Sequence, residues 1–397
     1  MTVRAITPES FPWFEYEGFT FSLGLDVGDR ALLSGHTGAA FDAAVGKMAI
    51  DGPMKDQAMV AYEKVTAILG GADMTWDDVV LVVQYITLSG LDQFDDAEAV
   101  RAHFCGANNP AVQTVVLERL VRRNAFIEIE VTASRNGQAY KIDSAGRAAY
   151  ATASEADGVV SLSTVYPYDE HGDLVGEGDV VAQTRQIFTN ASRILGSVGL
   201  STANVTKTVE MVTPAALRDY PSTGAVRKEF LGPVYPGAAG IVQQQVAVDD
   251  RVLISYDFTA SIHPPEAINP GWDRYSKLSY SPAVRAGNVL FMSGQAALDP
   301  VTERAVHAGD IVQQITYTFD NIVTVLEAAG LTAADLVKTV EYVTPDGLPD
   351  YRKTATVRSE VLSAPWPAST GAFCHSLLRP EFLIEIDPTA MYPSEPS

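Results

Sequence analysis

The chain has 397 residues, of which 47% are hydrophobic and 19% are charged, a composition typical of a folded protein with a sizeable core. Its 28 Lys and Arg residues against 49 Asp and Glu residues give a formal net charge of −21. Such a charge repels nucleic-acid phosphates and anionic membrane surfaces, so we expect neither nucleic acid nor a membrane as a partner.

Residues 1–11 lack the basic segment and apolar run of a signal peptide, and the apolar stretch at 79–86 is far shorter than the roughly 20 residues that span a bilayer. We therefore expect a cytoplasmic protein. Two cysteines and six scattered histidines form no metal-ligand motif, and no glycine-rich phosphate loop occurs. The expectation is that the protein uses no metal and no other cofactor.

Three stretches of the chain repeat one another. Ser34, Ser163 and Ser293 follow similar apolar runs and lie 129 and 130 residues apart. Self-similarity at a fixed period indicates repeated structural units. We place these units at residues 1–135, 136–265 and 266–397, with a linker rich in proline near the second boundary.

The elements follow the same order in each unit: a β-hairpin, a helix, a strand, a second helix and two strands. Apolar residues at three- and four-residue steps predict the first helices, at residues 57–69, 179–198 and 310–329. Apolar strands follow at residues 79–87, 205–213 and 336–344. The last strands are expected at residues 126–134, 253–261 and 383–391. This order predicts an α+β fold with helices on one sheet face. Short linkers favour a closed ring of units over separate domains.

The third unit carries the most specific motifs of the chain. They are Tyr280, GNVLFMSGQAALDP at 287–300, GDIVQQ at 309–314, LEAAGLTAADLVKTV at 326–340, and PAST with LLRPEFLIEID at 367–387. On these motifs the unit resembles the YjgF/RidA (reactive intermediate deaminase) family almost end to end. The second unit matches over its helices and KTVEMVT, and the first retains LLSG, PAVQT and FIEIE.

Single-unit chains of that family assemble as homotrimers, with ligand clefts between neighbouring subunits. The resemblance therefore implies three tandem chorismate-mutase-like units, closed into an intramolecular pseudo-trimer around a central β-barrel. It also implies a small-molecule substrate. A closed pseudo-trimer would be a monomer or a homodimer in solution.

The family's deaminases bind the substrate carboxylate with an arginine just after a Pro-Ala pair, because a guanidinium matches a carboxylate bidentately. The matching positions here are Val112, Ala238 (or Ala239) and Ser369, and none is an arginine. The resemblance therefore implies that all three units lack the usual anchor for 2-imino acids.

Two other family positions are retained. The resemblance implies that a glutamate of the last strand holds the hydrolytic water, and this residue corresponds to Glu128 and Glu385, with Ser255 in the middle unit. A buried carboxyl with a raised pKa can act as a general base. The alternative is that these glutamates form the polar face of a strand. The family's cleft tyrosine corresponds to Tyr150 and Tyr280, with Phe21 in the first unit.

Two repeated charged positions are open to two interpretations. The strand position is Gln84, Glu210 and Glu341, and the helix position is Arg101, Arg227 and Arg358. A charge within an apolar strand is costly unless it is paired, which favours a structural Glu–Arg pair. The alternative is that the arginines face the clefts and replace the lost anchor.

The turns after the hairpins supply the remaining candidates for substrate binding. Backbone N–H groups near the Ser-Gly turns are expected to polarise the substrate. The candidates are Ser34, Gly35, His36, Ser293, Gly294 and Ser369. His36 is either a structural residue or an acid/base.

The sequence leaves three hypotheses about function, and the balance favours an enzyme. The first is a cofactor-free enzyme that acts on a small imine, enamine or carbonyl intermediate by hydrolysis, deamination or proton transfer. The second is a non-catalytic binding or scaffold protein of the same fold. The third is a lyase or hydrolase that resembles the chorismatases.

Overall fold

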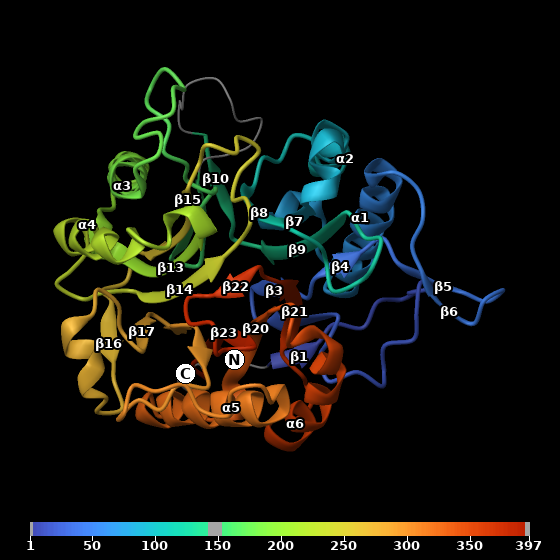
Figure 1. Cartoon of the computed structure of the whole chain (residues 1–397). Helices are drawn as coiled ribbons and strands as arrows, with labels where there is room; N and C mark the ends of the chain where they lie inside the picture. Colours follow the sequence, from blue (N-terminus) through green and yellow to red (C-terminus); the bar gives the residue numbers. More distant parts are fainter. Residues whose placement is uncertain (1–2, 142–152, 394–397) are drawn as a thin grey trace.

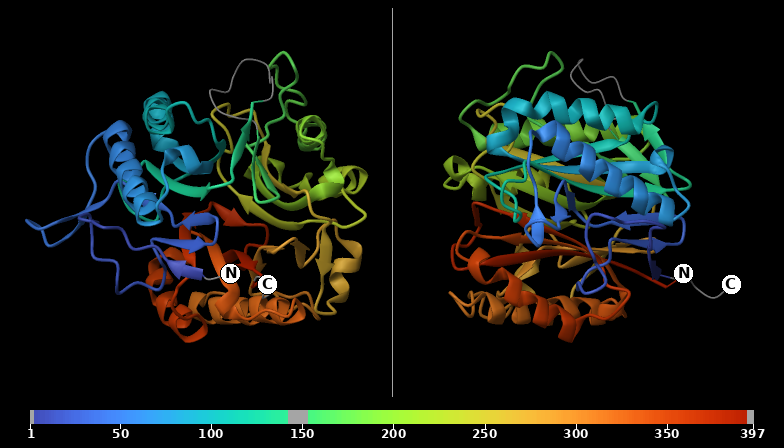
Figure 2. Two further views of the ribbon diagram at one scale, coloured as in Figure 1. Left: turned by 180° about the vertical axis from the view of Figure 1, so that it is seen from behind. Right: turned by 90° about the vertical axis from the view of Figure 1, so that its right-hand side faces the viewer.

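The computed structural model describes residues 3–141 and 153–393, and each of the three units builds one mixed sheet with two helices (Figure 1). The helices lie on the outside of the molecule and the sheets face its interior, in all the views of Figures 1 and 2. None of the helices within the described ranges has the length and apolar character that a bilayer crossing requires.

The first unit contains β1 (Val3–Ala5), β2 (Gly24–Val27), β3 (Arg30–Leu33), β4 (His36–Thr37), β5 (Ala40–Asp42), β6 (Lys47–Ala49), α1 (Met54–Gly71), β7 (Val79–Thr87), α2 (Phe94–Cys105), β8 (Ala111–Leu117) and β9 (Ile127–Ser134). The second contains β10 (Gln138–Tyr140), β11 (Ala153–Ala156), β12 (Val159–Leu162), α3 (Val180–Ser197), β13 (Val205–Val212), α4 (Thr223–Phe230), β14 (Gly237–Val242) and β15 (Ile254–Ser261). The third contains β16 (Glu266–Ile268), β17 (Ala283–Ala286), β18 (Val289–Met292), β19 (Gln295–Ala296), α5 (Ile311–Ala328), β20 (Leu336–Val343), α6 (Thr354–Val361), β21 (Ala368–Phe373), β22 (Ser376–Leu377) and β23 (Ile384–Met391).

The three main sheets have the same strand order. In the first unit the order is β1-β2-β3-β9-β7-β8, and the equivalent strands follow this order in the other two. Only the pairs β7–β8, β13–β14 and β20–β21 are parallel among these neighbours. A helix connects each parallel pair, as a parallel crossover requires. The α+β class and the three repeated units predicted from the sequence are therefore confirmed.

Local chemistry fixes the ends of the first helix in the second and third units. Asp179 and Asp310 accept hydrogen bonds from backbone N–H groups of the first turns of α3 and α5, as N-caps do. Gly330 follows α5 with a φ of 72°, a conformation that glycine adopts without strain. The predicted boundaries of these two helices are correct to within one residue.

A buried glutamine in each first helix holds the loop before the last strand. Gln57 donates to the Asn124 carbonyl at 3.0 Å and accepts from the Phe126 N–H at 2.8 Å. Gln183 and Gln314 make the equivalent pairs of hydrogen bonds in the other units. These bonds fix the loop that leads to Glu128, Ser255 or Glu385.

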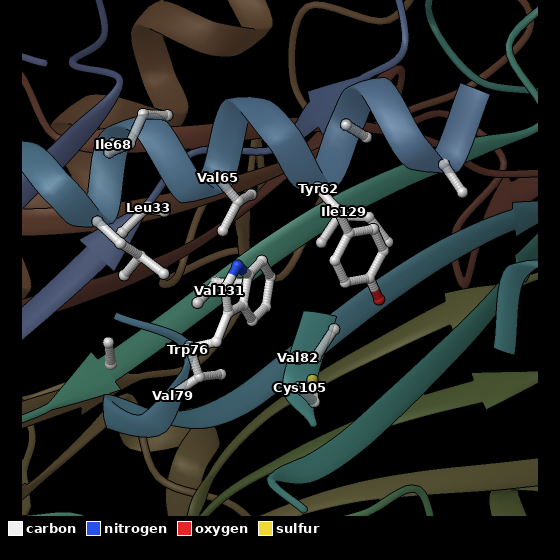
Figure 3. Close-up of a cluster of buried hydrophobic side chains, with 14 of the residues drawn as sticks. Leu33, Tyr62, Val65, Ile68, Trp76, Val79, Val82, Cys105, Ile129 and Val131 are labelled. Atoms are coloured by element: carbon white, nitrogen blue, oxygen red, sulfur yellow. The ribbon is translucent and has the colours of Figure 1, made fainter. Parts of the chain in front are cut away.

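Each unit has its own core between helices and sheet. In the first unit Tyr62 and Ile68 of α1 pack on Val82 of β7 and Ile129 of β9 (Figure 3). A further apolar cluster is shared by all three units and includes Tyr85, Met211 and Tyr342, which occupy equivalent strand positions. The inner faces of the sheets are thus buried against one another.

The units contact one another in a cycle. The Val112 N–H donates to the Ser163 hydroxyl at 3.0 Å, the Ala238 N–H to Ser293 at 2.8 Å, and the Ser369 N–H to Ser34 at 2.8 Å. No continuous strand ladder closes a β-barrel in the described part of the chain, which differs from the prediction. The physical reason is that side-chain hydroxyls and single backbone hydrogen bonds, rather than a continuous strand, satisfy these edges. Within the described residues β22 pairs with β14 of the second unit, and an isolated bridge joins Ser22 to Ala368.

Candidate active site at the junctions between units

We name the junctions by the units that meet there: 1/2, 2/3 and 3/1. At the 3/1 junction the last strand of the first unit meets β21, and at the 2/3 junction β23 meets β14. Two acidic residues, separated by one position, face each of these two junctions: Glu128 and Glu130, and Glu385 and Asp387.

The second acid of each pair is neutralised. Glu130 forms an ion pair with Lys338 of the third unit at 3.0 Å and accepts from the Thr370 hydroxyl at 2.5 Å. Asp387 forms an ion pair with Lys207 of the second unit. Each of these pairs crosses a junction and is largely buried, so it helps to hold two units in register.

The first acid of each pair has no such partner. Within the described residues, Glu128 and Glu385 make no hydrogen bond and no ion pair, although Glu128 is only 8% exposed. Burial, and then the neighbouring Glu130, raises the pKa of Glu128 to about 8, against the opposing charges of Lys64 and Lys338. Burial and Asp387 likewise raise the pKa of Glu385 to about 8. Both carboxyls are therefore mainly protonated at neutral pH and able to exchange a proton there.

A glycine makes room for each of these carboxyls. A β-carbon on Gly35 would lie 2.2 Å from the Glu128 Oε1 atom, and one on Gly294 would lie 2.1 Å from the Glu385 Oε1 atom. These distances are too short for any non-bonded contact. Gly35 and Gly294 are therefore needed because any side chain at these positions would collide with the carboxyl group.

The predicted glutamate–arginine pair is present in the second and third units. Arg227 contacts Glu210 at 2.6 Å, and Arg358 contacts Glu341 at 2.7 Å. In the first unit, where Gln84 replaces the acid, Arg101 pairs with Glu98 at 2.9 Å. These arginines are therefore neutralised within their own units, which argues against their use as free carboxylate anchors.

A tyrosine that the sequence analysis missed completes this pair. Tyr220 donates to Glu210 and Tyr351 donates to Glu341, each at 2.7 Å. The Tyr351 hydroxyl lies 2.9 Å from where Gly371 would carry a β-carbon. Burial, the charge of Glu341 and, more weakly, the charge of Glu128 raise the pKa of Tyr351, so it remains a donor. The repeated Asp-Tyr at 219–220 and 350–351 is the signal that could have identified these tyrosines.

An unpartnered acceptor lies in the same cluster. Oε1 of Glu341 is buried and has no hydrogen-bond partner within the described residues, whereas its Oε2 atom accepts from Tyr351 and Arg358. Such an atom is costly to bury without a partner. It can accept a hydrogen bond from an amino or hydroxyl group of a ligand.

Two tyrosines of the third unit, Tyr275 and Tyr280, are affected by the charge of Glu385. Tyr280 packs edge-on against Tyr275, at 5.5 Å between ring centroids. Burial raises the pKa of Tyr280, and the charges of Arg274 and Glu385 act on it in opposite directions. The role of Tyr280 as a cleft residue stays a prediction. Tyr150, the other predicted tyrosine, lies outside the described residues.

The 1/2 junction lacks these features. Ser255 occupies the position of the free acid, and Thr164 occupies the position of the glycine. The Thr164 hydroxyl donates to Asp257 at 2.6 Å and accepts from the Thr114 N–H at 2.9 Å. Burial raises the pKa of Asp257 to about 7. Threonine side chains therefore fill the space that glycines leave open elsewhere.

The serines and backbone N–H groups of the turns are engaged within the protein. Ser34 and Ser293 each accept one hydrogen bond across a junction and donate another to a backbone carbonyl. The Gly35 N–H donates to the Ser369 carbonyl, and the Gly294 N–H donates to the Ala238 carbonyl. The expectation that these glycine N–H groups polarise a substrate is therefore wrong, because they hold adjacent units together.

Two further candidates are also structural in their contacts. The Ser369 hydroxyl lies 3.1 Å from the Thr339 hydroxyl. His36 is buried, and its Nε2 atom lies 3.3 Å from the Leu23 carbonyl oxygen. Burial lowers the pKa of His36 to about 3, so the imidazole is neutral at physiological pH. In the described part of the chain no group of three or more His, Cys, Asp or Glu residues could hold a metal ion.

The fold and the junctions define a class: an α+β protein of three RidA-like units, with a free acid at two of its three junctions. A family model described as Endoribonuclease L-PSP matches residues 19–135, 142–252 and 273–392, so the chain belongs to this family, also known as YjgF/RidA.

Similar proteins include both single-unit chains and a larger enzyme. A RutC family protein of Pyrococcus horikoshii is 37% identical over 111 residues, which are 28% of this chain and 85% of the relative. A 3-aminoacrylate deaminase RutC of Acinetobacter baylyi is 36% identical over 83 residues, which are 21% of this chain and 64% of the relative. A solved chorismatase is similar in fold, with a TM-score of 0.51 at 17% identity, over 79% of this chain and 93% of that one.

Proposed function

We propose that this protein is a cofactor-free enzyme that deaminates a small enamine or imine by proton transfer and hydrolysis, at the 3/1 and 2/3 junctions. The observation that carries the proposal is a contrast between the acids: Glu130 and Asp387 are ion-paired, whereas the buried Glu128 and the half-buried Glu385 have no partner within the described residues. Leaving a buried acid without a partner lowers stability, so a function is the physical reason to retain it. A relative that is a 3-aminoacrylate deaminase supports an enamine as the substrate.

The chemistry follows from the pKa of about 8 of these carboxyls. The protonated Glu128 donates its proton to the β-carbon of an enamine, whose C=C bond becomes the C=N bond of an iminium ion. The resulting carboxylate then takes a proton from water while the water oxygen bonds to the iminium carbon. Loss of ammonia from this adduct leaves the carbonyl product. Glu385 is proposed to act in the same way at the 2/3 junction.

The hydroxyl of Tyr351 and the free Oε1 atom of Glu341 are proposed to orient the amino group at the 3/1 junction. At the 2/3 junction Tyr220 and Tyr280 are proposed to orient the amino group of the substrate. The 1/2 junction is proposed to be inactive, since it has neither the acid nor the space. The cyclic contacts also support the proposal that the units form a covalent counterpart of a homotrimer, which works as a monomer or a homodimer.

A second candidate is chorismatase-like cleavage of an enol ether, which is favoured by the similarity in fold to chorismatase. The same glutamates would protonate the enol carbon, and water would add to the oxocarbenium ion. The family's name does not lead us to propose RNA cleavage, because a chain of net charge −21 repels RNA.

The experiment is a turnover assay with 2-iminobutyrate made in situ, with a neutral imine and with chorismate, on the wild-type chain and on a Glu128→Gln, Glu385→Gln double variant. Release of ammonia that the double variant loses supports deamination. Turnover of chorismate alone supports the second candidate. Binding without turnover of any of the three supports the non-catalytic alternative.

A further inference from the structure

An open pocket of about 620 Å³ lies between the start of α1 and the loop that joins β8 to β9. Three guanidinium groups line it, from Arg119, Arg122 and Arg123, together with the polar side chains of Ser89 and Asn124. The acidic residue of this lining is Asp51. The pocket is thus positively charged, although the whole chain carries a net charge of −21.

None of these three arginines has an acidic partner within the described residues, although the Arg119 Nε–H donates to the Leu120 carbonyl at 3.2 Å. Arg119 and Arg122 are half-buried and Arg123 is exposed. By contrast, Arg30 pairs with Asp157 at 2.9 Å, and Arg358 pairs with Glu341 at 2.7 Å. On a chain with many more acids than bases, unpaired guanidinium groups in one pocket indicate a site for an external anion.

The pocket adjoins the 3/1 junction. Burial, and then the positive charge of Arg352 of the third unit, lowers the pKa of Arg122, while the charge of Glu128 opposes this shift. The charge of Arg122 in turn opposes the rise in the pKa of Glu128 that burial causes. An anion beside Arg122 would reduce its repulsion with Arg352.

The loop is held in place and is specific to the first unit. Gln57 bonds it at both the Asn124 carbonyl and the Phe126 N–H. In the second unit the loop positions of Arg122 and Arg123 are Asp249 and Asp250.

In the third unit the position of Arg122 is occupied by Arg379, which donates to the Glu303 carbonyl at 2.7 Å and so is already engaged. The unpaired cations thus occur at a junction that has a free acid, and aspartates occur at the junction that lacks one.

We propose that this pocket binds an anionic group of the substrate, a carboxylate or a phosphate, with Arg122 and Arg123 of its lining as its main ligands. The pocket would thus replace the carboxylate-binding arginine of the family, whose positions are occupied here by Val112 and Ser369. Its arginines come from a different loop. That the anion is a group of the substrate rests on the proposed function. That the pocket binds an anion does not depend on it.

The test is calorimetric titration of the full chain with malonate and with inorganic phosphate at low salt. Arg122→Gln and Arg123→Gln should each weaken binding by about tenfold or more, because a charge-assisted contact is lost. Arg122→Lys should recover part of the affinity, and the matched control Arg379→Gln should bind as the wild type does. In turnover assays Arg122→Gln should raise KM for the carboxylated imine and leave KM for the neutral imine unchanged.

A Glu128→Gln variant separates this inference from the proposed function. It should bind malonate at least as tightly as the wild type and lose turnover at the 3/1 junction. If it retains turnover while Arg122→Gln still loses malonate, the anion site stands and the catalytic role of Glu128 fails. If neither probe binds the wild type, or Arg379→Gln weakens binding as much as Arg122→Gln, the anion site is overturned.

Discussion

The space beside Gly35 is occupied by the carboxyl group of Glu128: a β-carbon at this glycine would lie 2.2 Å from the Glu128 Oε1 atom. Gly294 and Glu385 have the same relationship at the 2/3 junction. In the second unit neither residue is present: Thr164 replaces the glycine and Ser255 replaces the glutamate. A glutamate at this position of the last strand therefore occurs only where the hairpin ends in glycine. This pairing links a turn residue to a strand residue about 90 positions later in the sequence.

Gly35→Ala should displace the Glu128 carboxyl and lower activity by about 10²-fold, since small displacements of a reacting group have effects of this size. The measurement is turnover in a background that carries Glu385→Gln, so that the 2/3 junction does not contribute. Gly70→Ala adds the same methyl group in α1, where nothing lies within 4 Å. Equal losses in the two variants would contradict the role assigned to Gly35.

Glu128→Gln and Glu385→Gln, made singly, should each leave the activity of the other junction. The double variant should lose turnover by about 10²- to 10⁴-fold, the range of general acid–base catalysis. Comparison of kcat for the single variants on 2-iminobutyrate measures the share of each junction. A double variant as active as the wild type would exclude both residues from catalysis.

The pH dependence of stability should report the buried acids. The pKa of Glu128 and Glu385 rises from 4.5 to about 8 on folding, so the folded protein binds more protons than the unfolded chain between these values. The contribution of these residues to stability therefore falls as the pH rises from about 4.5 to about 8.

Glu128→Gln should accordingly raise the free energy of unfolding at pH 8 by about 1–3 kcal/mol, with little effect at pH 4.5. Glu130→Gln is the matched control, and it should lower stability at pH 8, because it leaves Lys338 buried without its ion-pair partner. Urea denaturation at both pH values measures the two effects. A lower stability of Glu128→Gln at pH 8 would be inconsistent with the raised pKa.

The glycine and glutamate of the other two junctions can be introduced at the 1/2 junction by mutation. Ser255→Glu alone should be destabilising, because Thr164 occupies the space that glycine leaves at the other junctions. Adding Thr164→Gly should recover much of the loss, of the order of 1–3 kcal/mol, in thermal denaturation. Additive effects of the two substitutions would show that the positions are not coupled.

The state of association provides a further check. Cyclic hydrogen bonds through Ser34, Ser163 and Ser293 already satisfy the edges at which a homotrimer would assemble. Light scattering should therefore give the mass of a monomer or a dimer of this 42.6 kDa chain. A trimer would contradict this prediction.

The sequence predicted the repeated units and their order well, because apolar periodicity, N-cap aspartates and C-terminal glycines act locally. The boundaries of β7 and of the helices α3 and α5 are correct to within one residue for this reason. The glutamate–arginine pairs of the second and third units also followed from a local rule, that a charge buried in a strand needs a partner.

Other properties could not be read in this way. Lys64, 1% exposed, lies near Glu128, and burial lowers its pKa to about 7, yet nothing in its helical context marks it. Arg122 and Arg352 are separated by 230 residues, and their charges interact only because folding brings the first and third units together.

The sequence by itself determined the family, the three units and the positions of the two glutamates, since these depend on local pattern and spacing. Only the tertiary structure decided which acids are neutralised, because Lys207 and Lys338 come from a different unit than the acids that they contact. It also decided that serines and glycine N–H groups join the units rather than face a substrate. Pairing and burial of charge depend on contacts between distant segments, and folding alone brings those segments together.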